Sequence, residues 1–170
     1  MSRHLPDQFD PWRFADHNRR VAGTYPLAEL PRLRDCLEDR QGEVRFDLTF
    51  SRDARNRACV HGRVDADLRL KCQRCLEVMS LAVRSVLSLA FVEGLDEAER
   101  LPDQLDPQLV EQGRVVLREM IEDELLLTLP QVAMHPYGEC SSGQASADEQ
   151  PATVDDNPFA VLADLKRRDA

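Results

Sequence analysis

The stretch Val44-Arg45-Phe46-Asp47-Leu48-Thr49-Phe50 decides the fold. Apolar side chains alternate here with polar ones, which is typical of a β-strand that buries one face and exposes the other. The polar run 52–57 predicts a hairpin connection, and a second alternating segment follows from Val60 to Leu70. Gly62 leaves a gap in the apolar row of this second strand, where we expect a bulge or a bend.

Outward from this hairpin, the pattern predicts a third strand over 81–92 and one main helix over 116–127. In that helix the apolar side chains share one face and the carboxylates of Glu122, Asp123 and Glu124 are expected on the solvated face. Hairpin-connected strands that precede a packing helix indicate an α+β fold, with an antiparallel sheet against the main helix.

The remaining segments are less regular. Residues 1–25 are polar and are expected to be irregular, residues 27–37 predict a short helix interrupted near Pro31, and residues 93–112 are expected to form an acidic loop. The domain organisation that follows is a single α+β domain over 1–137 and a flexible acidic and polar linker over 138–156.

A short amphipathic helix is predicted over 157–168, after the linker. Asn157 supplies an N-cap and Pro158 the first helical position. Because a helix of about a dozen residues is marginal alone, its apolar side chains are expected to dock on a partner. These docking candidates are Phe159, Val161, Leu162 and Leu165.

The charge of the chain is unevenly distributed. The 170 residues carry 22 Lys and Arg against 31 Asp and Glu, a formal net charge of −9. Residues 1–90 carry +3 and residues 91–170 carry −12. A uniformly basic nucleic-acid surface is therefore excluded, while a basic first half remains possible. The acidic second half suits either solubility or a basic protein partner.

Two further features concern the cellular compartment. The longest uninterrupted apolar run is five residues, so no membrane span is expected, and the N-terminal residues lack an apolar signal segment. Five cysteines, an odd number, argue against a disulfide framework in such a chain. The sequence therefore predicts a cytoplasmic protein.

One constellation carries the chemistry of a metal site. Cys72 and Cys75 form a CxxC pair between two predicted strands, and His135 and Cys140 follow the main helix. Three sulfurs and one imidazole nitrogen make a suitable ligand set for a structural zinc ion. Two other interpretations remain open at this point: unmetalled cysteines that serve packing, or a thiol redox pair.

Basic side chains gather around the predicted hairpin, where they could meet RNA phosphates, although an ordinary charged face is an equal alternative. The candidate RNA-binding residues are Arg52, Arg55, Arg57, Arg63, Arg69, Lys71 and Arg74. No phosphate-binding loop, nucleophile elbow or HExxH motif is present, so no small-molecule substrate is evident and we predict that the chain is not an enzyme.

Three ordered segments carry a family resemblance. They are Leu70-Lys-Cys-Gln-Arg-Cys-Leu76, Met120-Ile-Glu-Asp-Glu-Leu-Leu-Leu-Thr-Leu-Pro130 with His135 and Cys140 after it, and Asn157-Pro-Phe-Ala-Val-Leu-Ala-Asp-Leu-Lys166. Together with Asp10-Pro11-x-Arg13-x-Ala15, this order resembles the YceD family, also called DUF177. The resemblance implies a cytoplasmic role in the synthesis, processing or stability of 23S ribosomal RNA, with no established catalytic activity.

The function expected from sequence is thus a non-enzymatic factor in ribosome biogenesis that supports 23S rRNA and large-subunit assembly. Its expected partners are 23S rRNA or its precursor and basic ribosomal or assembly proteins. Two alternatives belong to other classes: a protein-protein adaptor with a zinc-stabilised or thiol-containing core and no direct RNA contact, and an enzyme that acts through Cys72 and Cys75.

Overall fold

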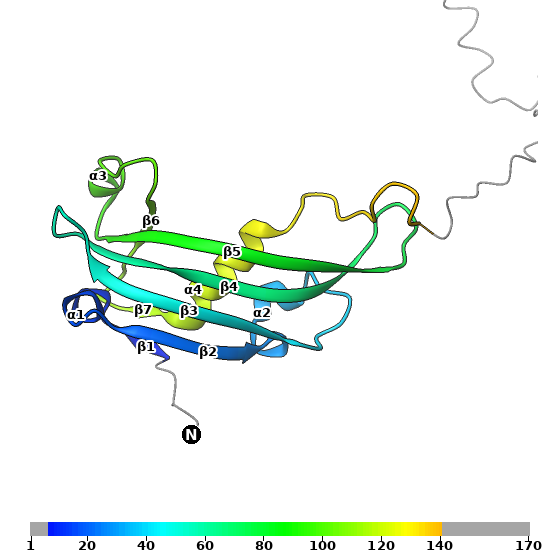
Figure 1. Ribbon diagram of the computed structural model, residues 1–170, viewed down its shortest axis with the longest axis horizontal. Helices are drawn as coiled ribbons and strands as arrows, with labels where there is room; N and C mark the ends of the chain where they lie inside the picture. The colour runs from blue at the N-terminus through cyan, green and yellow to red at the C-terminus, as the bar shows by residue number, and fades with distance from the viewer. Residues whose placement is uncertain (1–6, 141–170) are drawn as a thin grey trace, which may run out of the picture. The chain divides into compact units, whose positions relative to one another are not determined.

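The computed structural model describes residues 7–140 (Figure 1). The chain divides after His135 into two units, residues 1–135 and 136–170. In the described part of the second unit, the Glu139 amide donates to the Pro136 carbonyl at 3.1 Å. The predicted helix over 157–168, with Phe159, Val161, Leu162 and Leu165, and the linker beyond residue 140 lie outside the described residues.

A five-stranded sheet is the main element of the first unit. Its order is β2-β3-β4-β5-β6, with antiparallel pairing except between β5 and β6, which run parallel. The strands are β2 (Arg20–Pro26), β3 (Glu43–Arg52), β4 (Ala58–Lys71), β5 (Val78–Val92) and β6 (Asp106–Leu109). The three predicted strands are confirmed as the centre of this sheet.

Short elements and one longer helix complete the unit. They are β1 (Gln8–Phe9), α1 (Pro11–Asp16), the 3-10 helix η1 (Leu27–Glu29), α2 (Pro31–Arg34), α3 (Leu95–Ala98), β7 (Val115–Val116) and α4 (Leu117–Thr128). The α+β class and the main helix are therefore confirmed, and so is the interruption near Pro31, where η1 gives way to α2. No helix among residues 7–140 is long and apolar enough to cross a membrane.

The core lies between one face of the sheet and the helices. The apolar row of β3, Val44, Phe46, Leu48 and Phe50, is buried, and so are Leu117, Met120, Ile121 and Leu125 of α4. In Figure 1, α4 crosses behind β4 and β5, which leaves the opposite face of the sheet without a covering helix. The apolar side chains that alternate along the strand and those on one face of the helix thus pack together in one layer.

Glu122 corrects the expectation that all three carboxylates of the main helix are solvated. Its side chain is 1% exposed. One carboxylate oxygen accepts from the Arg32 amide at 2.7 Å and from the Leu33 amide at 2.9 Å. Because the first amides of a helix have no partner within the helix, Glu122 satisfies two of them in α2. The side chain therefore fixes α2 against α4.

The N-terminal residues are ordered rather than irregular, which corrects the expectation for 1–25 from residue 7 onward. Asp10 caps α1 by accepting from the Arg13 amide at 3.0 Å, and Pro11 takes the first helical position. Strand β2 then pairs with β3 along its whole length. Only Val21 and Tyr25 of β2 are buried, so its apolar pattern is too sparse to predict a strand.

The expected acidic loop over 93–112 also contains structure, α3 and β6. Strand β6 pairs with β5 in parallel, Leu89 with Asp106 through Val92 with Leu109. Pro107 has no amide hydrogen to donate, but β6 is an edge strand, where proline is tolerated. The sheet is therefore mostly, but not purely, antiparallel.

No bulge occurs at Gly62, contrary to the expectation, because the pairing of β3 and β4 is unbroken from Val44–Ala66 to Arg52–Ala58. Instead the two strands approach closely at this point. A β-carbon on Gly62 would collide with the Asp47 carbonyl oxygen and would lie 2.9 Å from the Leu48 α-carbon. Glycine is therefore required at position 62, because no side chain fits between the two strands.

Candidate functional site

The CxxC pair lies in the six-residue connection between β4 and β5, directly after the last paired residues, Lys71 and Val78. The Cys72 amide donates to the Glu77 carbonyl at 2.9 Å, and the Leu76 amide donates to the Cys72 carbonyl at 2.9 Å. Leu76 takes a positive φ of 63°. This tight turn brings the two cysteines to one side of the connection.

The segment after α4 returns to the same connection. The Gln73 amide donates to the Ala133 carbonyl at 2.8 Å, and the Arg74 guanidinium donates to the His135 carbonyl at 2.8 Å. These contacts join residues about 60 positions apart in sequence, which the spacing of the two ligand pairs requires of a metal site. They place His135 beside the cysteines.

The cluster is compact. The Cys75 sulfur lies 3.3 Å from His135 Nδ1, and the His135 amide donates to the Cys72 sulfur at 3.4 Å. The ligand atoms of the four candidates, with Cys140, all lie within 4.8 Å of one another. Around zinc, with Zn–S bonds of about 2.3 Å, tetrahedral geometry separates two sulfurs by about 3.8 Å. The donor set and its spacing fit a zinc ion.

The surroundings of Cys72 favour its thiolate. Burial of the side chain opposes ionisation, but hydrogen bonds from the backbone at Cys75, His135 and Arg74, and from the Cys75 side chain, lower its pKa to about 5. A thiolate is the form that binds metal. Packing alone explains Cys72, which is fully buried, but not the part-exposed Cys75, His135 and Cys140.

The seven candidate RNA-binding residues do not form one surface. Arg52, Arg55 and Arg57 surround the β3–β4 turn, whereas Lys71 and Arg74 lie at the opposite end of β4. A strand of 14 residues spans about 46 Å at about 3.3 Å per residue. The structure therefore separates the candidates into two ends of one long strand, with Arg63 and Arg69 between them.

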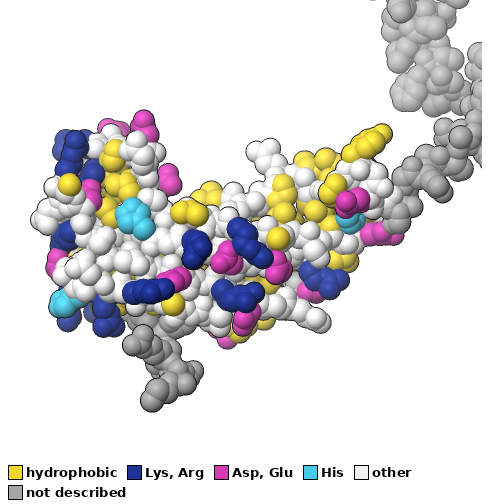
Figure 2. Space-filling view, viewed as in Figure 1, with side chains coloured by type: hydrophobic (Ala, Val, Ile, Leu, Met, Phe, Trp, Pro, Cys, Tyr) yellow, Lys and Arg dark blue, Asp and Glu magenta, His cyan; other side chains and the backbone are white. Residues whose placement is uncertain are grey.

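Most of these cations already have carboxylate or carbonyl partners. Arg52 pairs with Asp16 at 2.7 Å, Arg57 with Asp53 at 2.6 Å and Arg69 with Asp39 at 3.0 Å. Figure 2 shows the same interleaving of basic and acidic side chains across the uncovered face of the sheet. Among residues 7–140, no ion pair involves Arg55, Arg63 or Lys71. The uncovered face of the sheet thus carries both positive and negative side chains and is not a continuous cationic surface.

Comparison with known proteins identifies the family. A family model described as "Large ribosomal RNA subunit accumulation protein YceD" matches residues 60–166. A protein of that same description from Haemophilus influenzae is 33% identical over 172 residues, which cover 96% of this chain and 97% of the relative.

The chain belongs to the YceD family. The matched span includes the four residues of the cluster, Cys72, Cys75, His135 and Cys140. No solved structure matches the chain. The family assignment from sequence is confirmed.

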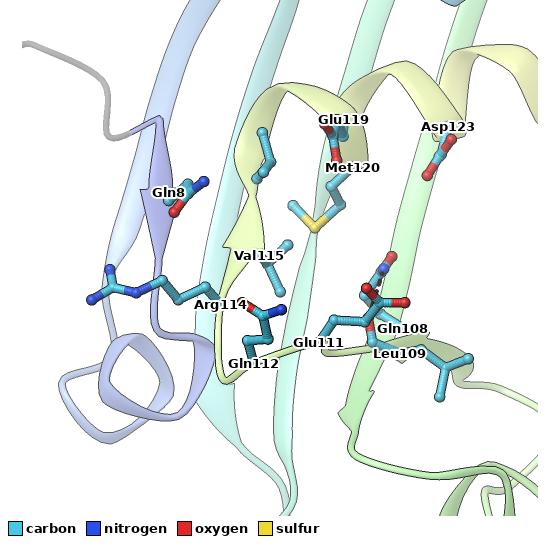
Figure 3. A pocket seen from close by; sticks show the side chains of 11 residues that line it. Gln8, Gln108, Leu109, Glu111, Gln112, Arg114, Val115, Glu119, Met120 and Asp123 are labelled. Carbon is cyan, nitrogen blue, oxygen red and sulfur yellow. Dashed lines mark hydrogen bonds between the residues drawn. The ribbon is translucent and has the colours of Figure 1, made fainter.

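The chain also carries an acidic groove that its sequence pattern did not predict. Two adjoining cavities of about 620 and 470 Å³ run between α4 and β6 and share Gln108, Leu109, Met120 and Asp123. Figure 3 shows the Met120 side chain pointing into the first cavity, with Glu119 and Asp123 above it on α4. The carboxylates that line the groove are Asp106, Glu111, Glu119, Asp123 and Glu124.

Apolar side chains supply the floor and rim of the acidic groove. Leu95 is 69% exposed and Leu127 is 83% exposed, and both line the second cavity. Arg32 and Arg114 also line the groove, and Arg32 is paired with Asp123. The sequence shows that the second half of the chain is acidic. It does not show that these carboxylates lie beside exposed leucines, because this arrangement depends on the parallel strand β6, which the sequence did not predict.

Proposed function

We propose that this protein is a non-enzymatic factor that supports the accumulation of 23S ribosomal RNA in the cytoplasm. The observation that carries the proposal is the relative of 33% identity, which is named for large ribosomal RNA subunit accumulation and matches nearly the whole chain. The finer statement, that the protein acts on synthesis, processing or stability of the RNA during large-subunit assembly, is part of the same proposal.

Complementation tests this function directly. A Haemophilus influenzae strain that lacks its own YceD is expected to show a reduced ratio of 23S to 16S ribosomal RNA, and this chain should restore the ratio. Cross-linking in cells should recover ribosomal RNA, its precursors or assembly proteins. A chain that is expressed and folded but neither restores the ratio nor cross-links to these molecules would refute the proposal.

We also propose that Cys72, Cys75, His135 and Cys140 bind one zinc ion with a structural role. The ion would hold the CxxC connection to the segment that follows α4, which contributes Ala133 and His135 to the same neighbourhood. Protein purified without chelator should contain one equivalent of zinc, and Cys75→Ser should lose it. Less than stoichiometric zinc with unchanged stability in the variant would favour packing, and thiol-dependent activity of the folded protein would favour the redox alternative.

The candidate RNA contacts remain a proposal as well, with one distinction from the structure. Arg52, Arg55 and Arg57 gather at one turn, so they can meet a single stretch of RNA backbone. Arg63, Arg69, Lys71 and Arg74 follow the strand to its other end. RNA–peptide cross-links should therefore concentrate at 52–57, and equal labelling of both ends of β4 would argue for a longer footprint.

For the second partner class, we propose that a basic ribosomal or assembly protein binds the acidic groove. The groove offers apolar side chains between carboxylates, which suits a basic segment with apolar anchors. Leu127→Asp is the informative variant, since its side chain is exposed and its loss costs the fold little. Reduced recovery of basic proteins with Leu127→Asp, but not with the exposed control Val132→Asp, is the expected result.

An adaptor without RNA contact is the alternative, with Phe159, Val161, Leu162 and Leu165 as a docking helix for its partner. This version includes the proposal that residues 1–137 fold as a domain without the linker and tail. Removal of 157–170 should then abolish partner recovery and leave the melting temperature unchanged. A lower melting temperature would mean that the tail belongs to the folded domain.

A further inference from the structure

One end of the sheet brings together three segments that lie far apart in sequence: α1, the β3–β4 turn, and the residues that follow β5. They meet at the left of Figure 1, where α3 lies beyond the end of β5 and α1 lies beside β3. Between them is a cavity of about 280 Å³. Small-molecule sites usually occupy about 300–1,000 Å³, so this cavity suits a group the size of a single planar ring system.

The apolar part of this cavity is aromatic. Trp12, on α1, lines it as a half-buried side chain, and Phe91 of β5 lines it from the core. Phe91 belongs to a cluster with Phe9, at 6.2 Å between ring centroids, and Phe50, at 6.1 Å. These contacts fix the inner wall, while the indole of Trp12 keeps part of its surface in solvent.

Three arginines from two segments complete the lining. Arg52 is held by Asp16 at 2.7 Å and donates to the Asn56 carbonyl at 2.8 Å, and Arg57 is held by Asp53. Arg100 is exposed, and within the described part of the chain it takes part in no ion pair. Arg52 and Arg57 are therefore pre-oriented, and Arg100 is available for an anion.

One carboxylate also lines the cavity. Glu97 is exposed, and its carboxylate accepts from the Glu93 amide at 3.0 Å, which holds it to its own turn. The lining therefore combines aromatic rings, three guanidinium groups and one engaged acid. Unpaired RNA bases are recognised in this way, because their faces stack on aromatic or guanidinium planes while cations meet the phosphates.

We propose that this cavity binds one unpaired nucleotide of an RNA strand, with the base against Trp12 and a phosphate at Arg100. The inference deepens the proposed function and rests on it, since it names the point at which RNA is held. It also explains how the turn arginines bind without a continuous basic surface: Arg55 meets the neighbouring backbone phosphate while the base enters the cavity. Trp12 lies 40 positions before Arg52, so the sequence alone does not bring the aromatic ring and the turn arginines together.

The chain contains a single tryptophan, so tryptophan fluorescence, excited selectively over the two tyrosines, reports on Trp12. The full-length protein is titrated with a single-stranded RNA octamer of mixed sequence, and separately with adenosine and uridine monophosphates. We expect saturable quenching by the octamer at low salt, with weaker quenching by the monophosphates. Equal affinity for monophosphate and octamer would indicate a free nucleotide as ligand and overturn the assignment to RNA.

Variants separate the cavity from the rest of the surface. By fluorescence anisotropy of labelled octamer, Trp12→Ala should weaken binding about 10-fold, within the range for loss of one stacked base. Arg100→Gln, at an exposed position, should weaken it by about 5-fold. Arg45→Gln, on the uncovered face of the sheet, is the matched control and should leave affinity unchanged. Circular dichroism of Trp12→Ala establishes that the variant is folded.

Two further outcomes would overturn the inference and are distinguishable from failure of the proposed function. If the octamer binds without any change in Trp12 fluorescence, and Arg100→Gln binds as well as Arg45→Gln, RNA is held elsewhere and the function stands. If no RNA binds while the chain still restores the 23S ratio in complementation, the cavity is not an RNA site and the protein acts through protein partners. If complementation also fails, the proposed function fails with it.

Discussion

The two ends of the long β4–β5 pair are stabilised by different kinds of side chain. At the turn end, where β4 begins and β5 finishes, Phe9, Phe14, Phe50 and Phe91 stack or meet edge to face within 6.2 Å. At the cysteine end, where β4 passes into β5, sulfur and imidazole atoms converge within 4.8 Å. The first end is held by apolar burial and the second by polar groups that are suited to a metal.

Because of this difference, the two ends should respond differently to chelators and to pH. Apolar burial is insensitive to chelators and to moderate changes of pH, whereas a thiolate cluster responds to both. The sheet between the two ends is continuous, so damage at the cysteine end need not reach the aromatic end. The two ends should therefore respond to different perturbations.

Loss of one aromatic side chain at the turn end should lower the stability of the protein more than the other changes. Phe50 is fully buried and contacts three other phenylalanine rings. Phe50→Ala is expected to lower the free energy of unfolding by about 3–5 kcal/mol, because it removes apolar contacts and leaves a cavity. Urea denaturation measures the change. Val86→Ala, at a side chain 76% exposed on β5, is the control and should remain within about 0.5 kcal/mol.

Metal removal should affect the other end alone. At free zinc 100-fold above its dissociation constant, the bound ion adds about 2.7 kcal/mol to stability, which chelation would remove. Hydrogen exchange should then rise in 72–77 and 129–135, with residues 8–16 and 50–58 unchanged. Faster exchange over the whole sheet after chelation would show that the two ends are not independent.

Glu122 provides an intermediate test, since it is a polar anchor outside both ends. Glu122→Ala leaves the part-buried amide of Arg32 and the buried amide of Leu33 without their acceptor, at a cost of about 1–3 kcal/mol. The exposed Glu119 on the same helix is the control, and Glu119→Ala should change little. Thermal unfolding of both variants compares them. Equal stability would mean that α2 is held by its apolar contacts and not by the carboxylate.

A separate test, of direction and not of size, is the pH dependence of the metal-free protein at Cys72. Its pKa in the folded state is lowered to about 5 from an ordinary value of 9.0, so the folded state favours the thiolate. This contribution is complete above about pH 9, declines as the pH falls, and is lost below about pH 5. The stability difference between the chelated protein and Cys72→Ser should therefore shrink towards acid pH, and a pH-independent difference would contradict the thiolate.

The central fold and the four-residue cluster could be predicted from sequence because both depend on strong local signals. The alternation from Val44 to Phe50 predicts its strand without tertiary information, and CxxC with a later histidine and cysteine limits the metal ligands by chemistry alone. The edge strands β2 and β6 could not be predicted, since one buries only Val21 and Tyr25 and the other contains Pro107.

Features that depend on distant contacts were also beyond sequence reasoning. Helical periodicity predicts a solvated Glu122, and its burial is favourable only because it accepts hydrogen bonds from α2 amides about 90 residues earlier in the chain. The aromatic cavity is of the same kind, because Trp12, Arg57 and Arg100 share no local pattern. The burial of Glu122 and the lining of the aromatic cavity both depend on long-range packing.

The contact at Gly62 has a consequence for how the chain finds this arrangement. Two alternating strands can shift by two residues and still direct their apolar side chains inward, so alternation alone leaves several alignments of β3 and β4 open. Only one alignment places the residue without a side chain where the backbone of Asp47 and Leu48 comes closest. Gly62 thus favours the observed register of β3 and β4 over registers shifted by two residues, because a residue with a β-carbon at this point would collide with the backbone of Asp47 and Leu48.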